Sequence, residues 1–496
     1  MNRSSISILL ISIFFVVIIS FNPGFSPDSF GYINAAKNFN LGCFSDIAVN
    51  SECLKPSLNW HPLYPFLLFL ISKIGFNYML SIPIQSTLFV ISCLFCASSL
   101  KKILYKDLPF IIIYLSFLIC PMTVQWHRWM LMDSFTTSCS LIFIGFGAEI
   151  IRKRNLISFI LFVLSLIIGY HFKITFLAFI FALLILTIKR FPLNNFSTIK
   201  SLIAIFLVLC VSLAPIQIRH LYLWDEPLFK RFPTNNKAYA PGYYKWLKTH
   251  VLSESDMVLY LNPLLSDNLD RILDYPNSEP YINSYIDKEN LLAAKKIIFN
   301  RGQESKLNLS ELDDSKFSNL SSQILDKKNK IINFASLNFK RAYIFLVDPP
   351  HEWQFRKAIE DSGLATLIRS NKLLSLKGMK TFISVEKIYV LKLCFRYFKH
   401  IYRIIILSLS IFSMLIPLVN YNEKFNLKKD IYFRNSYLFS LFCISVVIPF
   451  IGIHTISIAL EQRYVSTIFP FLTALSLTAT SFLLRYNSES KKTFQT

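Results

Sequence analysis

Long apolar blocks separated by short polar segments run through most of this chain, and this pattern predicts a mainly α, polytopic helical membrane protein. The blocks lie near residues 6–21, 78–100, 108–121, 133–151, 155–170, 174–188, 199–217, 402–419, 436–451 and 465–484. Most of them approach the roughly 20 residues that a helix needs to cross a hydrocarbon core about 30 Å thick. Their apolar residues are continuous rather than alternating, which is typical of spanning helices and not of barrel strands. We therefore expect about ten spans, within a range of roughly nine to thirteen.

Two stretches depart from this pattern. Residues 63–76 are apolar but too short to cross, and prolines flank the stretch, so we expect a re-entrant or interfacial helix. From residue 219 to about 400 the chain is rich in Pro, Asn, Asp and Ser, with helical runs near 283–300 and 320–347. Within it, residues 334–347 are apolar enough to lie on the bilayer surface.

These blocks divide the chain into three parts. We expect an N-terminal membrane domain at 1–217, whose first outer loop, 22–77, carries catalytic residues. An extracytoplasmic, partly helical segment follows at 218–400, and C-terminal membrane helices with a cytoplasmic tail occupy 401–496.

The net charge of +22 does not indicate a nucleic-acid-binding protein, because the basic residues follow the ends of the apolar blocks. With the N-terminus inside, seventeen cations fall on the inner segments: Arg3, Lys101, Lys102, Lys106, Arg152, Lys153, Arg154, Lys189, Arg190, Lys200, Lys424, Lys428, Lys429, Arg434, Arg485, Lys491 and Lys492. Only six fall on the short outer segments: Lys37, Lys55, Lys73, Arg128, Lys173 and Arg463. Because Lys and Arg favour cytoplasmic loops, we expect both termini to be cytoplasmic.

Most of the nine cysteines lie within or beside apolar blocks and are expected to be packing residues. Cys43 and Cys53 share the first outer loop. A disulfide between them would require an oxidising outer compartment, and two free thiols are the alternative.

An acid, aromatic residues, prolines and a His gather in the first outer loop, at 26–32 and 60–65. We interpret Asp28, Tyr32, His61 and Tyr64 as one wall of an active site. Asp28 follows a proline and precedes a helical run, so it can also be only a capping residue.

A second cluster, residues 125–134, places Arg128 and Asp133 at the outer end of the predicted span 133–151. A charged pair at the end of a span is unfavourable unless it is paired or faces a cavity, so it is a candidate site. The alternative is a snorkelling Arg within an aromatic belt.

Two further clusters lie at outer span ends. Lys173 ends the turn 169–173, where an interfacial anchor is the alternative to a ligand. His454 and the run of Glu461, Arg463 and Tyr464 precede the last span, where Arg463 can hold a phosphate through two hydrogen bonds. A solvated loop is the alternative for this last cluster.

Several of these motifs together resemble the GT-C membrane glycosyltransferases, most of all the branch with protein O-mannosyltransferases and aminoarabinose transferases. The matching residues are Pro27-Asp28-Ser29 with Tyr32, His61-Pro62-Leu63-Tyr64-Pro65, Arg128 with Asp133, Gly169 to Lys173, Pro215 with Arg219, and Arg463-Tyr464 with Pro470. The similarity covers residues 1–220 and the end of the chain, while 225–400 match little.

The resemblance implies sugar transfer, with inversion, from a polyprenyl-phosphate donor to a lipid, surface glycan or protein acceptor on the extracytoplasmic face. It assigns catalytic roles to Asp28, as general base, and to Asp133. The residues that it implies for substrate binding are Arg128, Lys173, Arg219, Arg463, Tyr32, His61, Tyr64, Glu461 and Tyr464. Ser29 stands where several relatives carry a second acid, so we expect neither a metal nor another cofactor.

The residue types suit this chemistry. A partly desolvated carboxylate can take the proton of an attacking acceptor, and fixed cations can stabilise a leaving phosphate. An O-antigen ligase or polymerase is an alternative that would not need an acid in the first loop. A polytopic lipid or glycan transporter, or a non-catalytic assembly subunit, is a further alternative, although the ionisable residues gather at span ends and no internal repeat is visible.

Overall fold

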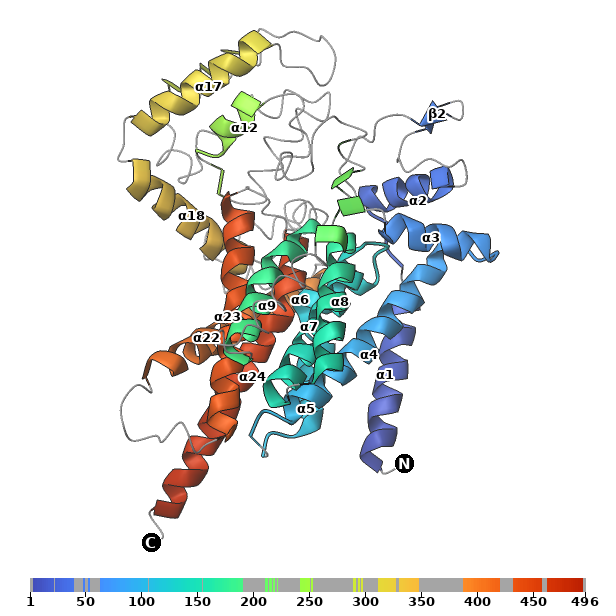
Figure 1. Cartoon of the computed structure of the whole chain (residues 1–496). Helices are drawn as coiled ribbons and strands as arrows, with labels where there is room; N and C mark the ends of the chain where they lie inside the picture. The colour runs from blue at the N-terminus through green and yellow to red at the C-terminus, as the bar shows by residue number, and fades with distance from the viewer. Residues whose placement is uncertain are drawn as a thin grey trace, which may run out of the picture.

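A computed structural model of the chain shows a bundle of long helices with shorter helices gathered at one end (Figure 1). Both chain termini lie at the opposite end, and we call the end that carries the short helices the upper end (Figure 1). The structure describes residues 3–39 except 22, 48–49, 52–53, 63–190 except 106 and 154, short pieces within 210–221 and 289–297, 241–252 except 250, 311–326, 330–347, 387–419, 431–456 and 462–493.

The described elements are almost all helical. In chain order the helices before the large polar segment are α1 (Arg3–Phe21), α2 (Pro27–Phe39), α3 (Leu63–Lys73), η1 (Tyr78–Leu80), α4 (Ser81–Lys101), α5 (Phe110–Leu118), α6 (Pro121–His127), α7 (Asp133–Arg152), α8 (Leu156–Phe172), η2 (Ile174–Phe179) and α9 (Ile180–Arg190). After them come α12 (Pro241–Leu247), α17 (Glu311–Asp326), α18 (Lys330–Val347), α22 (Lys387–Val419), α23 (Ile431–Ile456) and α24 (Gln462–Thr493). One two-stranded hairpin, β1 (Ala48–Val49) with β2 (Glu52–Cys53), lies in the first loop.

The prediction of a mainly α, polytopic membrane fold is confirmed. Among the described residues, five helices are long and apolar enough to span a membrane, or six if the bent pair α5 and α6 forms one span. The expected spans 6–21, 155–170 and 174–188 correspond to shorter apolar helices, and most of 199–217 lies outside the described residues. The expected total of about ten spans stays a prediction.

The expected span 108–121 differs from the structure in a way that proline explains. Helix α5 ends at Leu118, α6 begins at Pro121, and the two are bent by 55°. Proline lacks the N–H that a continuous helix would need, but it fits the first turn of a new one. The Tyr402 hydroxyl on α22 donates a hydrogen bond to the Ser116 carbonyl near this bend, at 3.2 Å.

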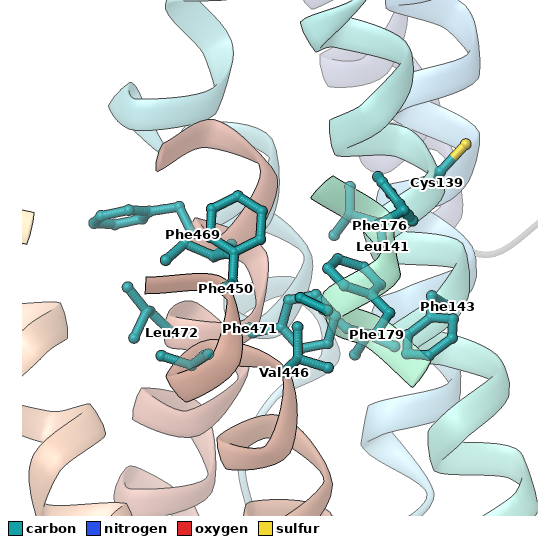
Figure 2. Close-up of a cluster of buried hydrophobic side chains, with 14 of the residues drawn as sticks. Cys139, Leu141, Phe143, Phe176, Phe179, Val446, Phe450, Phe469, Phe471 and Leu472 are labelled. Carbon is teal, nitrogen blue, oxygen red and sulfur yellow. The ribbon is translucent and has the colours of Figure 1, made fainter. Parts of the chain in front are cut away.

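Helix α7 lies inside the bundle, where phenylalanines of several helices meet. The Phe143 ring lies 5.1 Å from the Phe179 ring and 5.6 Å from that of Phe442, and Phe179 meets Phe471 edge-on at 5.0 Å; Figure 2 shows part of this cluster. A Cβ added to Gly147 would lie 2.6 Å from Phe442. The small residue therefore lets the two helices approach closely, as at many membrane-helix interfaces.

Above the bundle, α12 and α17 pack together, and α18 links them to α23 (Figure 1). Arg341 on α18 is almost fully buried, and its guanidinium donates to the carbonyls of Lys248 and Val251, both at 2.7 Å, and of Thr455 at 3.5 Å. Burial and the neighbouring Arg341 charge lower the pKa of Lys248. The predicted helical run 320–347 consists of two helices, α17 and α18, and the Arg341 contact with Thr455 joins α18 to the bundle.

Candidate functional site

Asp133 and Lys173 form a buried ion pair at the upper end of the bundle. Lys173 Nζ lies 2.6 Å from Asp133 Oδ1, and the two side chains are 5% and 0% exposed. Asp133 is the first residue of α7, where the helix dipole favours a negative charge. Lys173 directly follows α8 in an extended conformation, so the α7–α8 hairpin brings the start of one helix next to the end of the other.

The second carboxylate oxygen of Asp133 has no hydrogen-bond partner among the described residues, although it is fully buried. The Tyr64 hydroxyl on α3 is likewise buried, with the Ser81 hydroxyl as a polar neighbour. Burial raises the pKa of Tyr64, and the charge of Asp133 adds to the increase, while the Ser81 hydroxyl opposes it in part; the group therefore stays a neutral phenol. Buried polar groups in native proteins are nearly always hydrogen-bonded, so the open Asp133 oxygen points to a ligand or to water.

Aromatic rings surround the ion pair. Lys173 Nζ lies 3.7 Å from the centre of the Tyr464 ring, which is a cation–π contact. The Tyr464 ring lies 5.1 Å from His454 on α23. On the other side, Tyr64 meets Tyr32 edge-on at 5.0 Å. Tyr64 also lies 5.6 Å from Phe135, which stacks at 5.0 Å on Phe172, the residue before Lys173. Lys173 in turn contacts both Asp133 and Tyr464, so these five sequence-predicted residues lie in one region.

The segment that carries Asp28 docks on the turn between α6 and α7. Gly24 N–H donates to the Arg128 carbonyl at 2.7 Å, and Met130 N–H donates to the Gly24 carbonyl at 3.1 Å. The Ser29 hydroxyl also donates to Met130 O, at 2.9 Å. A Cβ on Gly24 would lie only 2.7 Å from the Trp129 ring, so a glycine is required for this approach. The first two predicted clusters are therefore neighbours in space.

The capping role that the sequence left open for Asp28 belongs to Ser26. Helix α2 begins at Pro27, and Ser26 and Ser29 exchange hydrogen bonds: Ser26 N–H donates to Ser29 Oγ at 2.9 Å, and Ser29 N–H donates to Ser26 Oγ at 3.3 Å. This reciprocal pattern is that of a capping box. Asp28 lies in the first turn, partly exposed, and its carboxylate is not needed as the cap.

The remaining predicted residues are placed in part. Arg128 is exposed, and its guanidinium lies 5.4 Å from the Trp129 ring, which is the aromatic neighbour that the snorkelling alternative expects. Four predicted residues cannot be placed: His61, Arg219 and Glu461 lie outside the described residues, and so does the side chain of Arg463. The proposed bridge between Cys43 and Cys53 also lies outside them.

Three buried polar groups of the described helices were not predicted. Gln85 of α4 is buried, and its amide donates to the carbonyls of His127 and Trp129, both at 2.7 Å, so it holds the turn on which Asp28 docks. Lys399 and Arg403 of α22 are also buried. The sequence feature that could have identified them is a polar residue inside or beside an apolar block. Such a residue is unfavourable in lipid, so it is often retained for a function. In the described part of the chain, no three His, Cys, Asp or Glu residues gather in a way that could hold a metal ion.

The helices and the buried charges define an integral membrane protein with a polar site at the upper end of its bundle. No protein-family model matches the sequence, and no curated protein matches it. Among solved structures, the crystal structure of ArnT from Cupriavidus metallidurans in the apo state is similar, with 10% sequence identity and a TM-score of 0.36, over 96% of this chain and 78% of that chain.

Proposed function

We propose that this protein is a membrane glycosyltransferase that moves a sugar from a polyprenyl-phosphate donor to an acceptor at the upper, extracytoplasmic end of the bundle. One observation carries the proposal. A buried Asp133–Lys173 ion pair, with one carboxylate oxygen unpartnered, lies next to the turn on which the Asp28 segment docks. These acids occupy the two positions that the motif resemblance assigns to catalysis.

In the proposed step, an acceptor hydroxyl or amine attacks the anomeric carbon from the side opposite the phosphate. The new bond to the acceptor forms while the bond between the anomeric carbon and the phosphate oxygen breaks, so the configuration inverts. The acceptor proton passes to the Asp28 carboxylate, and the electron pair of the broken bond leaves with the polyprenyl phosphate. A positioned carboxylate of this kind contributes about 10²- to 10⁴-fold to a rate.

The other residues position the reactants. Asp133 Oδ2 accepts a hydrogen bond from a sugar or acceptor hydroxyl, while Oδ1 stays on Lys173. Cations near the leaving oxygen stabilise its growing charge in a site with little water. For this role we propose Arg128, Arg219 and Arg463, with Lys173 contributing its field from within the ion pair. Tyr32, Tyr64, Tyr464, His61 and Glu461 are proposed to line the sugar site, and the polar segment above the bundle is proposed to dock the acceptor.

The test is sugar transfer by the full-length protein in liposomes that contain polyprenyl-phosphate sugars. The sugar donors to be tested are chosen by mass spectrometry, which compares the surface glycans of cells with and without the protein. We expect Asp28→Asn to lower transfer by at least about 100-fold without loss of the folded protein. Asp133→Asn should lower transfer by at least the same factor, but it also destabilises the protein, because buried Lys173 loses its charge partner. Glu149→Gln, which changes an acid at the other end of α7, is the matched control and leaves transfer unchanged.

Transfer at the wild-type rate by a folded Asp28→Asn variant would instead favour a ligase or polymerase that needs no acid in the first loop. Movement of the lipid-linked sugar across the bilayer without any transfer would favour a transporter. Either result overturns the proposal.

A further inference from the structure

A polar contact joins α6 and α22 outside the set of residues described for the candidate site. Lys399 of α22 is 2% exposed, and its Nζ donates to Gln125 Oε1 of α6 at 2.9 Å. Arg403 lies one turn further along α22 and is 0% exposed. Two cations four residues apart share one face of a helix, and the Arg403 guanidinium also donates to the Phe345 carbonyl of α18 at 3.5 Å.

The orientation of the Gln125 amide follows from its partner. A lysine ammonium has only donors, so the amide atom that faces it must be the oxygen. The amide nitrogen, which carries two donors, is consequently turned away; it is buried and has no partner among the described residues. The junction therefore presents amide N–H groups beside the Lys399 cation, with Arg403 one turn further along α22, and this combination is complementary to an anionic oxygen.

The position of the junction along α22 indicates where that oxygen comes from. The apolar span of this helix begins at Tyr397, only two residues before Lys399. Tyr397, Phe398 and Ile401 are 55%, 50% and 56% exposed, so apolar side chains flank the buried cations on the outer surface of the bundle. An apolar surface just below a cationic site fits a lipid whose phosphate binds the cations and whose chain follows the helix.

We propose that Gln125, Lys399 and Arg403 form a binding site for the phosphate of a polyprenyl monophosphate lipid, where α6 meets α22. The occupant rests on the proposed function, in which this lipid is the leaving group. The site holds the phosphate through the Gln125 amide and the two cations, and it is separate from the Asp133–Lys173 pair.

The test is native mass spectrometry of the detergent-solubilised full-length protein with a polyprenyl monophosphate, and with the uncharged polyprenol as the apolar control. Gln125→Glu is the decisive variant, because it has the same shape and gives Lys399 a carboxylate partner. We expect it to weaken binding of the phosphate lipid at least about tenfold, since hydrogen bonds to charged groups are worth about 1.5–3 kcal/mol. Its melting temperature stays equal or rises, and polyprenol binding does not change.

Lys399→Met should weaken binding in the same direction, while Lys73→Met, an exposed lysine at the end of α3, should not. Wild-type binding by Gln125→Glu overturns the proposal, and so does an equal loss of polyprenol binding, which would indicate altered packing. Equal displacement of the bound lipid by inorganic phosphate or by phosphatidylglycerol would show a general phosphate site and overturn the assigned occupant.

The assay contains no sugar, so its outcome is separable from that of the proposed reaction. Normal binding by Gln125→Glu in a protein whose transfer depends on Asp133 defeats this inference alone. Weakened binding in a protein that transfers no sugar defeats the proposed function alone.

Discussion

The two ends of helix α7 carry ion pairs of the same chemical type in opposite environments. At the lower end, Glu149 accepts from Lys102 at 2.6 Å and from Arg152 at 2.7 Å, and the two basic side chains are 42% and 30% exposed. At the upper end, Asp133 and Lys173 are 0% and 5% exposed. Exposed pairs contribute about 0–1 kcal/mol, whereas burying a pair removes several kcal/mol of hydration that the attraction must offset.

This difference indicates that a contribution to stability does not explain why the buried ion pair is present at the upper end. At the lower end, both Glu149 oxygens are hydrogen-bonded, and the arrangement is complete within the chain. At the upper end, one buried Asp133 oxygen has no partner among the described residues. A buried polar group without a partner is unfavourable. The hydrogen bonding at the upper end is thus incomplete within the described residues, as expected for a site that binds a substrate.

The largest expected effect comes from Lys173→Met. Removing one partner of a buried pair leaves an uncompensated charge, which destabilises a protein by about 3–5 kcal/mol. We expect this loss in the free energy of unfolding, measured by chemical denaturation of the full-length protein in detergent. Adding Asp133→Asn to the variant removes the second charge and should recover most of the stability without recovering transfer. A double variant as unstable as Lys173→Met would mean that packing, not charge, accounts for the effect.

The next effect tests how the Asp28 segment docks on the upper end. In Gly24→Ala the new Cβ would lie 2.7 Å from the Trp129 ring. Overpacking of this kind costs about 1–3 kcal/mol, and a displacement near 1 Å in a site can lower a rate about 100-fold. Transfer is therefore expected to fall more than the melting temperature suggests. Gly452→Ala in α23 is the matched control, because its Cβ meets nothing within 4 Å. If both variants behave alike, the docking of Asp28 is not needed.

A smaller effect comes from the aromatic side of the upper pair. Tyr464→Leu removes the ring that Lys173 Nζ approaches to 3.7 Å. The loss of a partly buried cation–π contact is expected to reduce the unfolding free energy by about 0.5–2 kcal/mol. Tyr464→Phe keeps the ring and should keep the stability, so the two variants separate the ring from the hydroxyl. Equal losses in both would assign the effect to the hydroxyl.

At the upper end, the sequence predicts where a charged residue lies when that residue marks the end of an apolar block. Asp133 was expected to open the span 133–151, and α7 begins there. Lys173 was expected at an outer turn, and the hairpin of α7 and α8 places both at the same end. That the two pair with each other, rather than with substrate, depends on distances that neither motif contains.

The other buried polar groups depend on contacts between segments far apart in the chain. Gln85 and Lys399 are single polar residues in or beside apolar stretches, and their partners lie 42 to 274 positions away. Hydrophobic periodicity detects an apolar face but not the partner of one polar side chain. The role of Ser26 as the cap was missed for a similar reason, because Asp28 is an equally favoured capping residue.

The smallest expected effect is at the lower end of α7 and completes the comparison. Lys102→Met removes one of two cations around Glu149, while Arg152 keeps its hydrogen bond at 2.7 Å. Because Lys102 is 42% exposed, we expect a loss below about 1 kcal/mol that shrinks further as salt rises, since the Debye length falls to about 3 Å at 1 M. The loss caused by Lys173→Met should persist at high salt, because buried charges are screened much less. Unfolding measured at low and high salt for both variants checks this, and equal salt sensitivity would mean that water reaches the upper pair as freely as the lower one.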